Sequence, residues 1–456
     1  MPIYKRKGSK AECINYRGIT LLSVPGKLFA MLLLKRATRY LRALRRPQQA
    51  GFMPGRSTTE QIHTIRQLVE KTLEYKRKAY IAFVDFRSAF DTVDRQSLWL
   101  ILQSAGVPTK IVRLLKELYN NTESAVIVNG RPSGYFKIKN GVRQGCAAAP
   151  ELFNCVIDHI LNKTQQVQPF GIGFAGRVLS DVDFADDVAL ICENISDLKT
   201  TLETLASAAE KFGLKINWSK TKIMPVEKTP SNPLSSVEIC GQTVEVVKQF
   251  TYLGSIVCSN GSLDAEISAR AAKANSVFGR LLKTVFHKPQ ISRLTKARIY
   301  SASVASVMLY SAETWSLTQT QTLKVDAIQT KHLRKIERSR WPDRVRNSEI
   351  LRSFKLPPLS EQLESRSLRW YGHLLRLPAQ TPARLIFDFD PAANGWRRPR
   401  GRPRTRWADV IRDRLASRNI NPAEVTTLAL NRPLWRRLTA LTTGSLYAGD
   451  AAEQEI

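Results

Sequence analysis

Three acidic residues stand where apolar stretches of the sequence give way to polar ones. Asp85 comes near the end of the apolar run Tyr80–Phe86, and Asp186 and Asp187 are adjacent between two further apolar runs. Neighbouring carboxylates in a turn repel each other, which would destabilise the turn unless a cation bound there. Carboxylate oxygens suit Mg²⁺, and two such ions about 3.5–4 Å apart activate a hydroxyl and stabilise a leaving phosphate group. The pattern predicts a metal site for phosphoryl transfer.

The apolar runs are expected to be the strands that bring these carboxylates together. The run that contains Asp85 is continuous, as is typical of a strand buried on both faces. Arg177–Phe184 and Val188–Cys192 are predicted to be two strands joined by the turn that holds the Asp pair. Strand ends and turns allow such side chains to converge without burying unpaired charge.

Helical patterns precede and separate these strands. Apolar residues at helical spacing predict six helices: Lys27–Tyr40, Ser57–Tyr75, Arg95–Ala105, Ile111–Tyr119, Pro150–Lys163 and Ile195–Phe212. Asp94 is expected to cap the third of them, because a side-chain oxygen at that position accepts from the first free N–H groups. The Asn129-Gly130 pair predicts a hairpin of Ala125–Val128 with Tyr135–Ile138, since it accepts positive φ.

The second half of the chain begins with a linker rich in Pro and Ser, Pro225–Ser236. Short strands are expected around Val237–Val247 and Phe250–Val257, followed by a helical pattern from Asp264 to about Ile336. The last hundred residues are basic, punctuated by Pro and expected to lack long periodic segments. This order of elements predicts an α+β fold, with a catalytic core flanked by helices.

The charge balance points to a polyanionic partner. The 456 residues include 70 Lys and Arg against 39 Asp and Glu, a formal net charge of +31. Nucleic acid is the favoured partner, and an anionic membrane surface is the alternative. No apolar run is long enough to span a membrane and no signal peptide is recognisable, so a soluble, intracellular protein is expected. Six scattered Cys without paired spacing favour a reducing compartment and no zinc site.

Seven short motifs occur in a fixed order along the first 260 residues. They are Asn15–Leu22, Gln49–Thr58, Ala82–Asp91, Gly141–Cys146, Phe184–Leu190, Gly213–Asn217 with Ser219–Lys222, and Phe250–Ser255. In sequence and order they resemble two fingers motifs and motifs A to E of the reverse transcriptase domain of non-LTR (LINE-type) retrotransposons. Residues 264–336, with Tyr310–Trp315 as a marker, and parts of the tail resemble the segments that follow in these elements.

The resemblance implies a right-hand polymerase fold with fingers, a β-sheet palm and a helical thumb. The expected division is fingers 1–76, palm 77–260 with motifs A to E, thumb 261–345 and a basic C-terminal region 346–456. Asp85, Asp186 and Asp187 would hold two Mg²⁺ ions, or Mn²⁺ as a substitute. The motif A carboxylate and the first motif C carboxylate are the principal ligands in the family.

Further site residues are implied by their place in the same motifs. Phe90 would stack under the sugar and exclude a 2′-OH, and Gln144, with Arg143 and Gly145, would contact the incoming nucleotide and template. Lys220 would protonate the leaving pyrophosphate, while Tyr252 and Gly254 belong to the primer grip. Without the resemblance, Phe90 would be assigned to the core and Lys220 to the solvated surface.

Other acidic and aromatic residues have simpler interpretations. Asp91 and Asp94 are expected to be turn and cap residues, and Asp181 and Asp183 to flank the hairpin without touching metal. His63 and His159 are given no role.

The C-terminal region contains six Arg between 397 and 406, flanked by Trp396 and Trp407. Arginine binds phosphate bidentately and stacks on bases, so contact with RNA or DNA is favoured over a solvated tail. Arg400–Pro403 also matches the core of an AT-hook, a less favoured interpretation because short basic matches are common.

The function implied is that of an RNA-directed DNA polymerase, a nucleotidyltransferase that adds dNTPs to a DNA 3′-OH. Its partners would be an RNA template and a DNA primer or nicked target DNA, in a nuclear or cytoplasmic ribonucleoprotein; the oligomeric state stays open. The match begins within the first twenty residues, so the endonuclease domain usual in such elements is expected to be missing. The alternative is a catalytically inactive, nucleic-acid-binding remnant of a truncated element. A maturase-like splicing factor is less favoured, because the motifs after 250 resemble transposon tails.

Overall fold

The computed structural model describes residues 2–5, 8–20, 22–128, 130–174, 176–228, 234–338, 343, 345–401 and 404–441. Contacts divide the chain into two compact units. Unit 1 comprises Met1–Gln61, Lys78–Pro225 and Pro230–Val247, and unit 2 comprises Ile62–Arg77, Val226–Thr229 and Lys248–Ile456. Each unit has its own hydrophobic core and is described by itself.

A six-stranded sheet is the centre of unit 1. Its strands are, in order across the sheet, β10 (Asp181–Phe184), β11 (Asp187–Cys192), β3 (Ala79–Val84), β12 (Lys222–Val226), β14 (Gln242–Val246) and β13 (Ser236–Ile239). Strand β11 is antiparallel to both β10 and β3, while β12 and β14 are parallel to each other. Five of the six residues of β3 are buried, as its continuous apolar sequence predicts for a strand inside a sheet.

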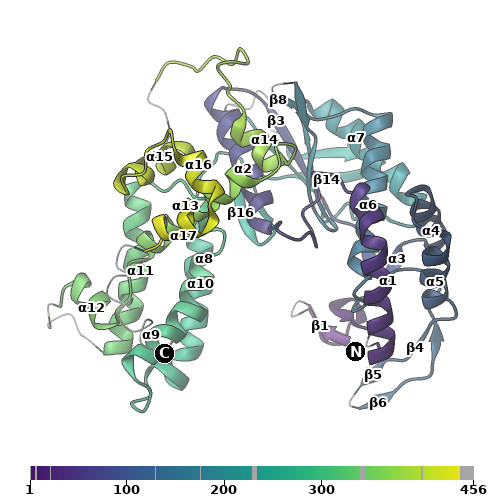
Figure 1. Cartoon of the computed structure of the whole chain (residues 1–456), viewed down its shortest axis with the longest axis horizontal. Coiled ribbons are helices and arrows are strands. Elements are labelled where there is room, and N and C mark those ends of the chain that lie inside the picture. Colours follow the sequence, from purple (N-terminus) through teal and green to yellow (C-terminus); the bar gives the residue numbers. More distant parts are fainter. Residues whose placement is uncertain are drawn as a thin grey trace. The chain divides into compact units, whose positions relative to one another are not determined.

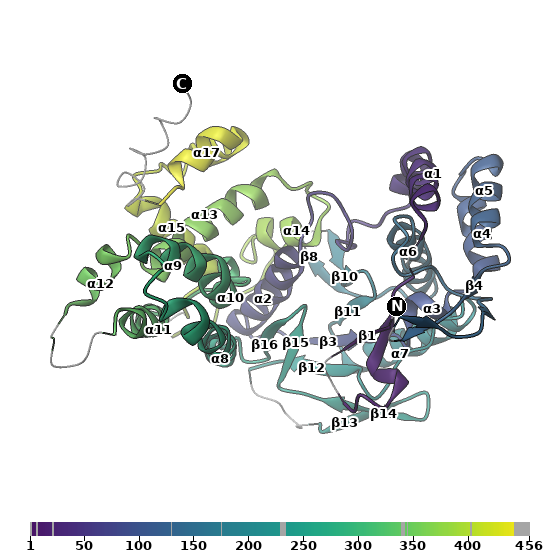
Figure 2. The same ribbon diagram turned by 90° about the horizontal axis from the view of Figure 1, so that it is seen from below.

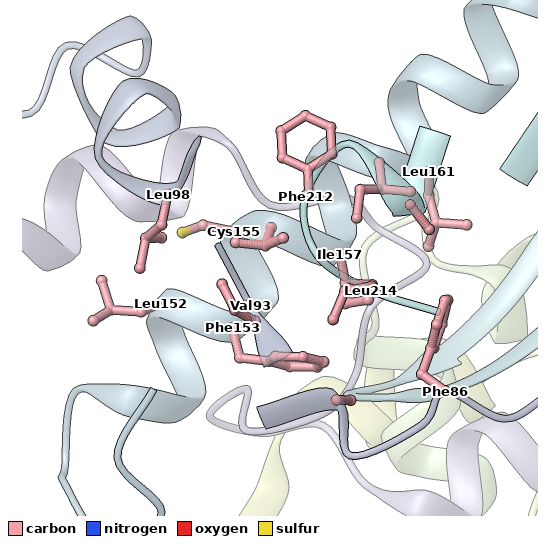
Figure 3. Packing of buried hydrophobic residues seen from close by; sticks show 14 of the residues in the cluster. Phe86, Val93, Leu98, Leu152, Phe153, Cys155, Ile157, Leu161, Phe212 and Leu214 are labelled. Atoms are coloured by element: carbon pink, nitrogen blue, oxygen red, sulfur yellow. The ribbon is translucent and has the colours of Figure 1, made fainter. Parts of the chain in front are cut away.

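Helices of unit 1 pack on the sheet and on one another. They are α1 (Val24–Ala43), the first turn of α2 (Thr58–Glu74), α3 (Ala89–Thr92), α4 (Arg95–Ser104), α5 (Thr109–Tyr119), α6 (Ala149–Val167) and α7 (Ile195–Glu210). Figure 1 shows α4 and α5 side by side, and α7 contacts both β3 and β11. In Figure 3, side chains of α6 such as Phe153, Ile157 and Leu161 gather with Phe212 and Leu214 from the segment after α7.

Short two-stranded ribbons complete this unit. They are β1 (Pro2–Tyr4) with β2 (Tyr16–Gly18), β4 (Glu123–Ser124) with β7 (Phe136–Lys137), β5 (Ile127–Val128) with β6 (Arg131–Pro132), and β8 (Ile172–Phe174) with β9 (Arg177–Leu179). The predicted hairpin around residue 130 is therefore present as two short ladders. Asn129 of its predicted turn lies outside the described residues.

Unit 2 is mainly helical. Besides the rest of α2 it contains the hairpin β15 (Gln249–Tyr252) and β16 (Ser255–Cys258), then α8 (Asp264–Leu281), α9 (Arg293–Tyr300), α10 (Ser306–Met308), α11 (Gln319–Glu337) and α12 (Asn347–Ser353). Its C-terminal helices are α13 (Leu359–Arg376), α14 (Pro382–Asp388), α15 (Trp407–Ser417), α16 (Val425–Leu430) and α17 (Arg432–Leu438). Figure 2 shows α8 to α11 as neighbouring helices, and α13 contacts α11, α15, α16 and α17.

Two expectations about elements are wrong. The last hundred residues do contain a long periodic segment, because α13 runs for 18 residues and buries Leu359, Leu363 and Trp370 on one side. The linker predicted from Pro225 begins later, since β12 continues to Val226 and pairs with β14. The pairs of β12 with β14 are Lys222 with Glu245 and Ile223 with Val246, so this ladder needs no N–H from Pro225. Part of the predicted linker, 229–233, lies outside the described residues.

None of the helices among the described residues is both long enough and apolar enough to cross a membrane.

Candidate active site

The Asp pair lies at the tip of a tight hairpin in unit 1. Phe184 of β10 pairs with Asp187 of β11, so only Ala185 and Asp186 form the loop between the strands. Ala185 has φ of +58°, a conformation that two-residue hairpin loops need and that L residues adopt with strain. The apolar residues on either side, buried in the sheet, fix the register and so fix where both carboxylates emerge.

Asp85 reaches the same end of the sheet from the neighbouring strand. Val188 of β11 is paired with Val84 of β3 in an antiparallel register. One step further along each strand brings Asp187 and Asp85 next to each other, since paired strands lie about 4.8 Å apart. The structure thus gathers the three carboxylates that the sequence predicts to act together.

The segment after α7 holds the backbone of Asp85. Asn217 donates its backbone N–H to the Asp85 carbonyl at 2.7 Å, and Phe86 bridges to Ile216. The Asp85 N–H donates to the Thr221 hydroxyl at 3.4 Å. Lys220 lies on the same turn, and its Nζ is 3.4 Å from Asp85 Oδ2.

The charges at this site act on one another. Burial raises the pKa of Asp186, and the nearby Asp85 carboxylate adds to the rise while Arg17 opposes it. Asp187 keeps one side open to solvent, yet partial burial together with Asp186 and Asp85 raises its pKa to about 6. Both shifts mark a concentration of negative charge that a cation would relieve.

The donor set fits a divalent cation, although the side chains do not form a finished cage. Asp85 Oδ2 is shielded from solvent and has no hydrogen-bond partner among the described residues, although the Lys220 ammonium is 3.4 Å away. Carboxylate oxygens of this kind are the ligands that Mg²⁺ takes. Within the described ranges, however, no group of three His, Cys, Asp or Glu residues is close enough to enclose a metal ion. Substrate phosphates complete the shell in sites of this kind.

Motif A and motif B meet beyond Asp85. Phe90 stacks on Phe153 of α6 with ring centroids 4.4 Å apart, and it is only half-buried. Gln144 Nε2 donates to both Asp91 oxygens, at 3.3 and 3.5 Å. Asp94 accepts from the Ser97 N–H at 2.7 Å, which confirms the predicted cap. Asp91 is thus held by motif B.

Local contacts explain the positions of two further motif B residues, Gly145 and Arg143. Gly145 has φ of +112°, and a Cβ there would lie 2.5 Å from the Thr20 carbonyl oxygen, so only glycine fits. The approach is close because the Thr20 N–H donates to the Gln144 carbonyl at 2.7 Å. The Arg143 guanidinium lies over the Tyr119 ring, 5.4 Å from its centroid.

Sequence reasoning missed Arg17 as a residue of the site. It lies on β2, within the first fingers motif. Its positive charge partly offsets the rise in the pKa of Asp186 and Asp187 that burial and the neighbouring carboxylates cause. Arg17 therefore acts electrostatically on the Asp pair from β2. The motif match was the only signal that could have drawn attention to it.

A buried ionic network behind the hairpin was also missed. Arg46 binds Asp181 bidentately at 2.6 and 2.7 Å and contacts Asp183 at 3.2 Å, and both carboxylates are fully buried. Burial opposes ionisation of Asp181, but the Arg46 guanidinium outweighs it and lowers the pKa of that carboxyl. Burial, and then the charge on Asp181, raise the pKa of Asp183. These residues therefore flank the hairpin as structural ion pairs.

The predicted primer-grip residues lie in unit 2, in a second tight hairpin. Tyr252 pairs with Ser255, which leaves Leu253 and Gly254 as a two-residue loop. Both have positive φ, +47° and +81°, as a type I′ turn requires. Tyr310 donates to the Leu253 carbonyl at 2.8 Å, so the marker of the following segment supports this turn.

The arginine-rich segment is ordered rather than a solvated tail in the part that the structure describes. Arg398 and Arg406 both pair with Glu74 of α2, at 3.1 and 3.4 Å. The Trp407 N–H donates to Glu70 at 2.9 Å. Arg402 and Pro403 of the AT-hook match lie outside the described residues.

Carboxylates at a strand end and in the adjacent hairpin turn, on a sheet covered by helices, are the arrangement that metal-dependent phosphoryl transfer requires. The family model described as reverse transcriptase (RNA-dependent DNA polymerase) matches residues 4–257, more than half of the chain. The chain belongs to the reverse transcriptase family. The predicted family and the α+β fold class are both confirmed.

Relatives come from mobile elements. The chain is 24% identical over 402 residues to the RNA-directed DNA polymerase from mobile element jockey of Drosophila funebris, covering 86% of this chain and 42% of that protein. It is 25% identical over 385 residues to the probable RNA-directed DNA polymerase from transposon BS of Drosophila melanogaster, with 82% and 41% covered. The chain thus spans less than half the length of these relatives.

Among solved structures, telomerase from Candida tropicalis with a TWJ fragment of telomeric RNA is similar to 90% of this chain. The match covers 56% of the telomerase chain, with a TM-score of 0.41 and 13% identity.

Proposed function

We propose that this chain is the polymerase part of a non-LTR retrotransposon protein, an RNA-directed DNA polymerase that adds dNTPs to a DNA 3′-OH. One observation carries the proposal: the antiparallel register of β3 and β11 brings Asp85 beside Asp187, next to the turn that holds Asp186. Membership of the reverse transcriptase family supports the reaction class.

Asp85, Asp186 and Asp187 would hold two Mg²⁺ ions, or Mn²⁺ in their place. The ions would lower the pKa of the primer hydroxyl and stabilise charge on the leaving pyrophosphate. The three side chains supply carboxylate oxygens at one end of strands β3 and β11, where Asp187 is exposed to solvent. Their position on paired strands keeps them in place without rearrangement.

Other residues of the chain would handle the substrate itself. Lys220, already beside Asp85, would deliver a proton and positive charge to the pyrophosphate. Phe90 would support the sugar and exclude a 2′-OH, because its ring is fixed by stacking on Phe153 yet stays half open. Gln144, with Arg143 and Gly145, would contact the incoming nucleotide and template.

The partners proposed are an RNA template, a DNA primer or nicked target DNA, and dNTPs. Tyr252 and Gly254 would support the primer end. The proposed domains are fingers in 1–76, palm in 77–260, a thumb in 261–345 that acts on the duplex, and a basic region in 346–456. The net charge of +31 favours such polyanions and a ribonucleoprotein in the nucleus, the cytoplasm or both.

A primer-extension assay tests the proposal. Purified chain is given an RNA template, a DNA primer, dNTPs and Mg²⁺, and is compared with Asp186→Ala and with Asp197→Ala. Asp197 is an acidic residue on α7 that serves as the matched control. We expect extension by the chain and by Asp197→Ala, and a loss of at least about 1000-fold in Asp186→Ala. Equal extension in all three would refute the site, and binding without any extension would favour the inactive remnant.

A further inference from the structure

The catalytic turn has a backbone that its own hairpin leaves unpaired. In a two-residue loop, the ladder hydrogen bonds are made by the flanking residues, here Phe184 and Asp187. The N–H and the carbonyl of Ala185 therefore need partners from elsewhere. Ala185 is only 4% exposed, so water supplies little of that need.

Gln49 supplies partners for both groups. Its Oε1 accepts from the Ala185 N–H at 2.8 Å, and its Nε2 is 3.5 Å from the Ala185 carbonyl oxygen. The same Oε1 accepts from the Gly51 N–H at 2.8 Å. The Gln49 side chain is fully buried, so water does not compete for these hydrogen bonds.

The segment around Gln49 is itself fastened to β10. Gln49 forms a parallel bridge with Asp183, and the Ala50 N–H donates to the Asp183 carbonyl at 2.9 Å. Gln61 Nε2 donates to both the Gln48 and the Asp183 carbonyls, at 2.7 and 2.6 Å. The side chain of Gln49 is thus presented to the turn from a fixed backbone.

Gly51 and Asn154 close the arrangement from the other side. A Cβ on Gly51 would lie 2.3 Å from the Ala185 nitrogen, so the two backbones are in direct contact. Asn154 of α6, fully buried, donates to the Gly51 carbonyl at 2.8 Å. The 48–51 segment is therefore held between α6 and the turn, within unit 1.

We propose that Gln49 is a positioning residue that acts on catalysis through Ala185. Its carboxamide keeps Ala185 at positive φ, and this conformation directs the next residue, Asp186, toward Asp85. Without the two contacts, Ala185 would relax to negative φ and the Asp186 carboxylate would turn away. The inference rests on the proposed function, since it assigns the turn a role in holding divalent cations for the reaction.

Three substitutions separate hydrogen bonding from space filling. Gln49→Met keeps the approximate volume and removes every hydrogen bond, Gln49→Glu keeps an acceptor for both N–H groups, and Gly51→Ala pushes on the turn directly. The matched control is Gln103→Ala, because Gln103 is exposed on α4. Thermal unfolding of each variant reports whether the fold is kept.

The first measurement is primer extension with KM and kcat separated. We expect Gln49→Met and Gly51→Ala to lose about 100-fold in kcat, because a displacement near 1 Å costs that much. KM for primer–template should stay within about twofold of the wild-type value, since a misplaced supporting group affects the metal site more than substrate binding. Gln49→Glu should recover at least part of the rate, and Gln103→Ala should equal the wild type.

The second measurement does not depend on polymerisation. Mn²⁺ binding is followed by electron paramagnetic resonance with Asp186→Ala as the reference for loss of the site. We expect Gln49→Met to weaken Mn²⁺ binding by about 10-fold or more. If the wild-type chain binds Mn²⁺ but does not extend primers, the proposed function is refuted, while the role of Gln49 in positioning the cation site is not. A Gln49→Met variant with wild-type kcat and Mn²⁺ affinity would overturn the positioning role itself, as would a loss matched by Gln103→Ala.

Discussion

Removing the positive charge of Arg46 should destabilise unit 1 through the charge it leaves behind. In Arg46→Met, the approximate volume is kept while the bidentate pair with Asp181 and the contact with Asp183 disappear. Both carboxylates are fully buried, and both lose the cation that contacts them. Breaking a buried pair in this way costs about 3–5 kcal/mol, mostly as the penalty of an uncompensated buried charge.

The pH dependence identifies the cause. Arg46 lowers the pKa of Asp181 in the folded protein, so this pair contributes stability above the unfolded-state pKa of about 3.9. The contribution is lost as the pH falls below that value through the folded pKa. In Arg46→Met, burial without the guanidinium raises the pKa of Asp181, so its carboxyl becomes protonated and the stranded charge disappears as the pH falls toward 4. The difference between wild type and Arg46→Met should therefore be largest near pH 6 and shrink toward pH 4.

Urea unfolding, followed by hydrogen exchange in peptides from β10 and β11, measures unit 1 on its own. The double variant Arg46→Met/Asp181→Asn is the control, because it removes the stranded charge together with its partner. We expect it to recover more than half of the lost free energy of unfolding. A loss that is the same at pH 4 and pH 6, or that the double variant does not reduce, would refute the account of an uncompensated charge.

Three further outcomes are expected. Gly145→Ala should lower the free energy of unfolding by about 1–3 kcal/mol in a denaturation assay, because its φ of +112° and the Thr20 carbonyl exclude a Cβ; Gly134→Ala, with no atom within 4 Å of its Cβ, should change little. Glu74→Gln should speed tryptic cleavage between Arg398 and Arg406, which lose their shared partner, whereas Glu424→Gln should not. Affinity for RNA or DNA, measured by electrophoretic mobility shift, should fall at least about 10-fold between 50 and 200 mM salt, and an unchanged affinity would contradict phosphate-driven binding.

Local signals explain what could be predicted from the sequence. The apolar run before Asp85 has only one stable arrangement, a strand covered on both faces, and it is the third strand of the six-stranded sheet. Asp94 stands immediately before a helix and accepts a hydrogen bond from a free N–H group of its first turn, which is a short-range effect. The turn with the Asp pair followed from two predicted strands, Arg177–Phe184 and Val188–Cys192, separated by three residues. Each of these inferences uses neighbours in the chain.

Pairings over long sequence distances left no such signal. Arg46 and Asp181 are 135 positions apart, and neither lies in a pattern that identifies a buried charge. Gln49 was noted only as the first residue of a motif, because nothing local shows that its carboxamide faces Ala185. The helix α13 was missed for a different reason: its apolar residues are interspersed with Arg and Ser, so burial of one side is evident only from the packing against α11, α15 and α16.

Two tight turns in this chain carry residues assigned to catalysis and to the primer, and both are held by side chains from distant segments. The Ala185–Asp186 turn is held by Gln49, and the Leu253–Gly254 turn is held by Tyr310 and Arg270, which both bond to its carbonyls. A two-residue loop with positive φ is strained when its residues carry a Cβ, as Ala185 and Leu253 do. The strain persists because relaxing either turn would break hydrogen bonds that no neighbouring residue could replace. Each turn is therefore held in the conformation that the structure shows, and the side chain proposed to act there needs no rearrangement before substrate arrives.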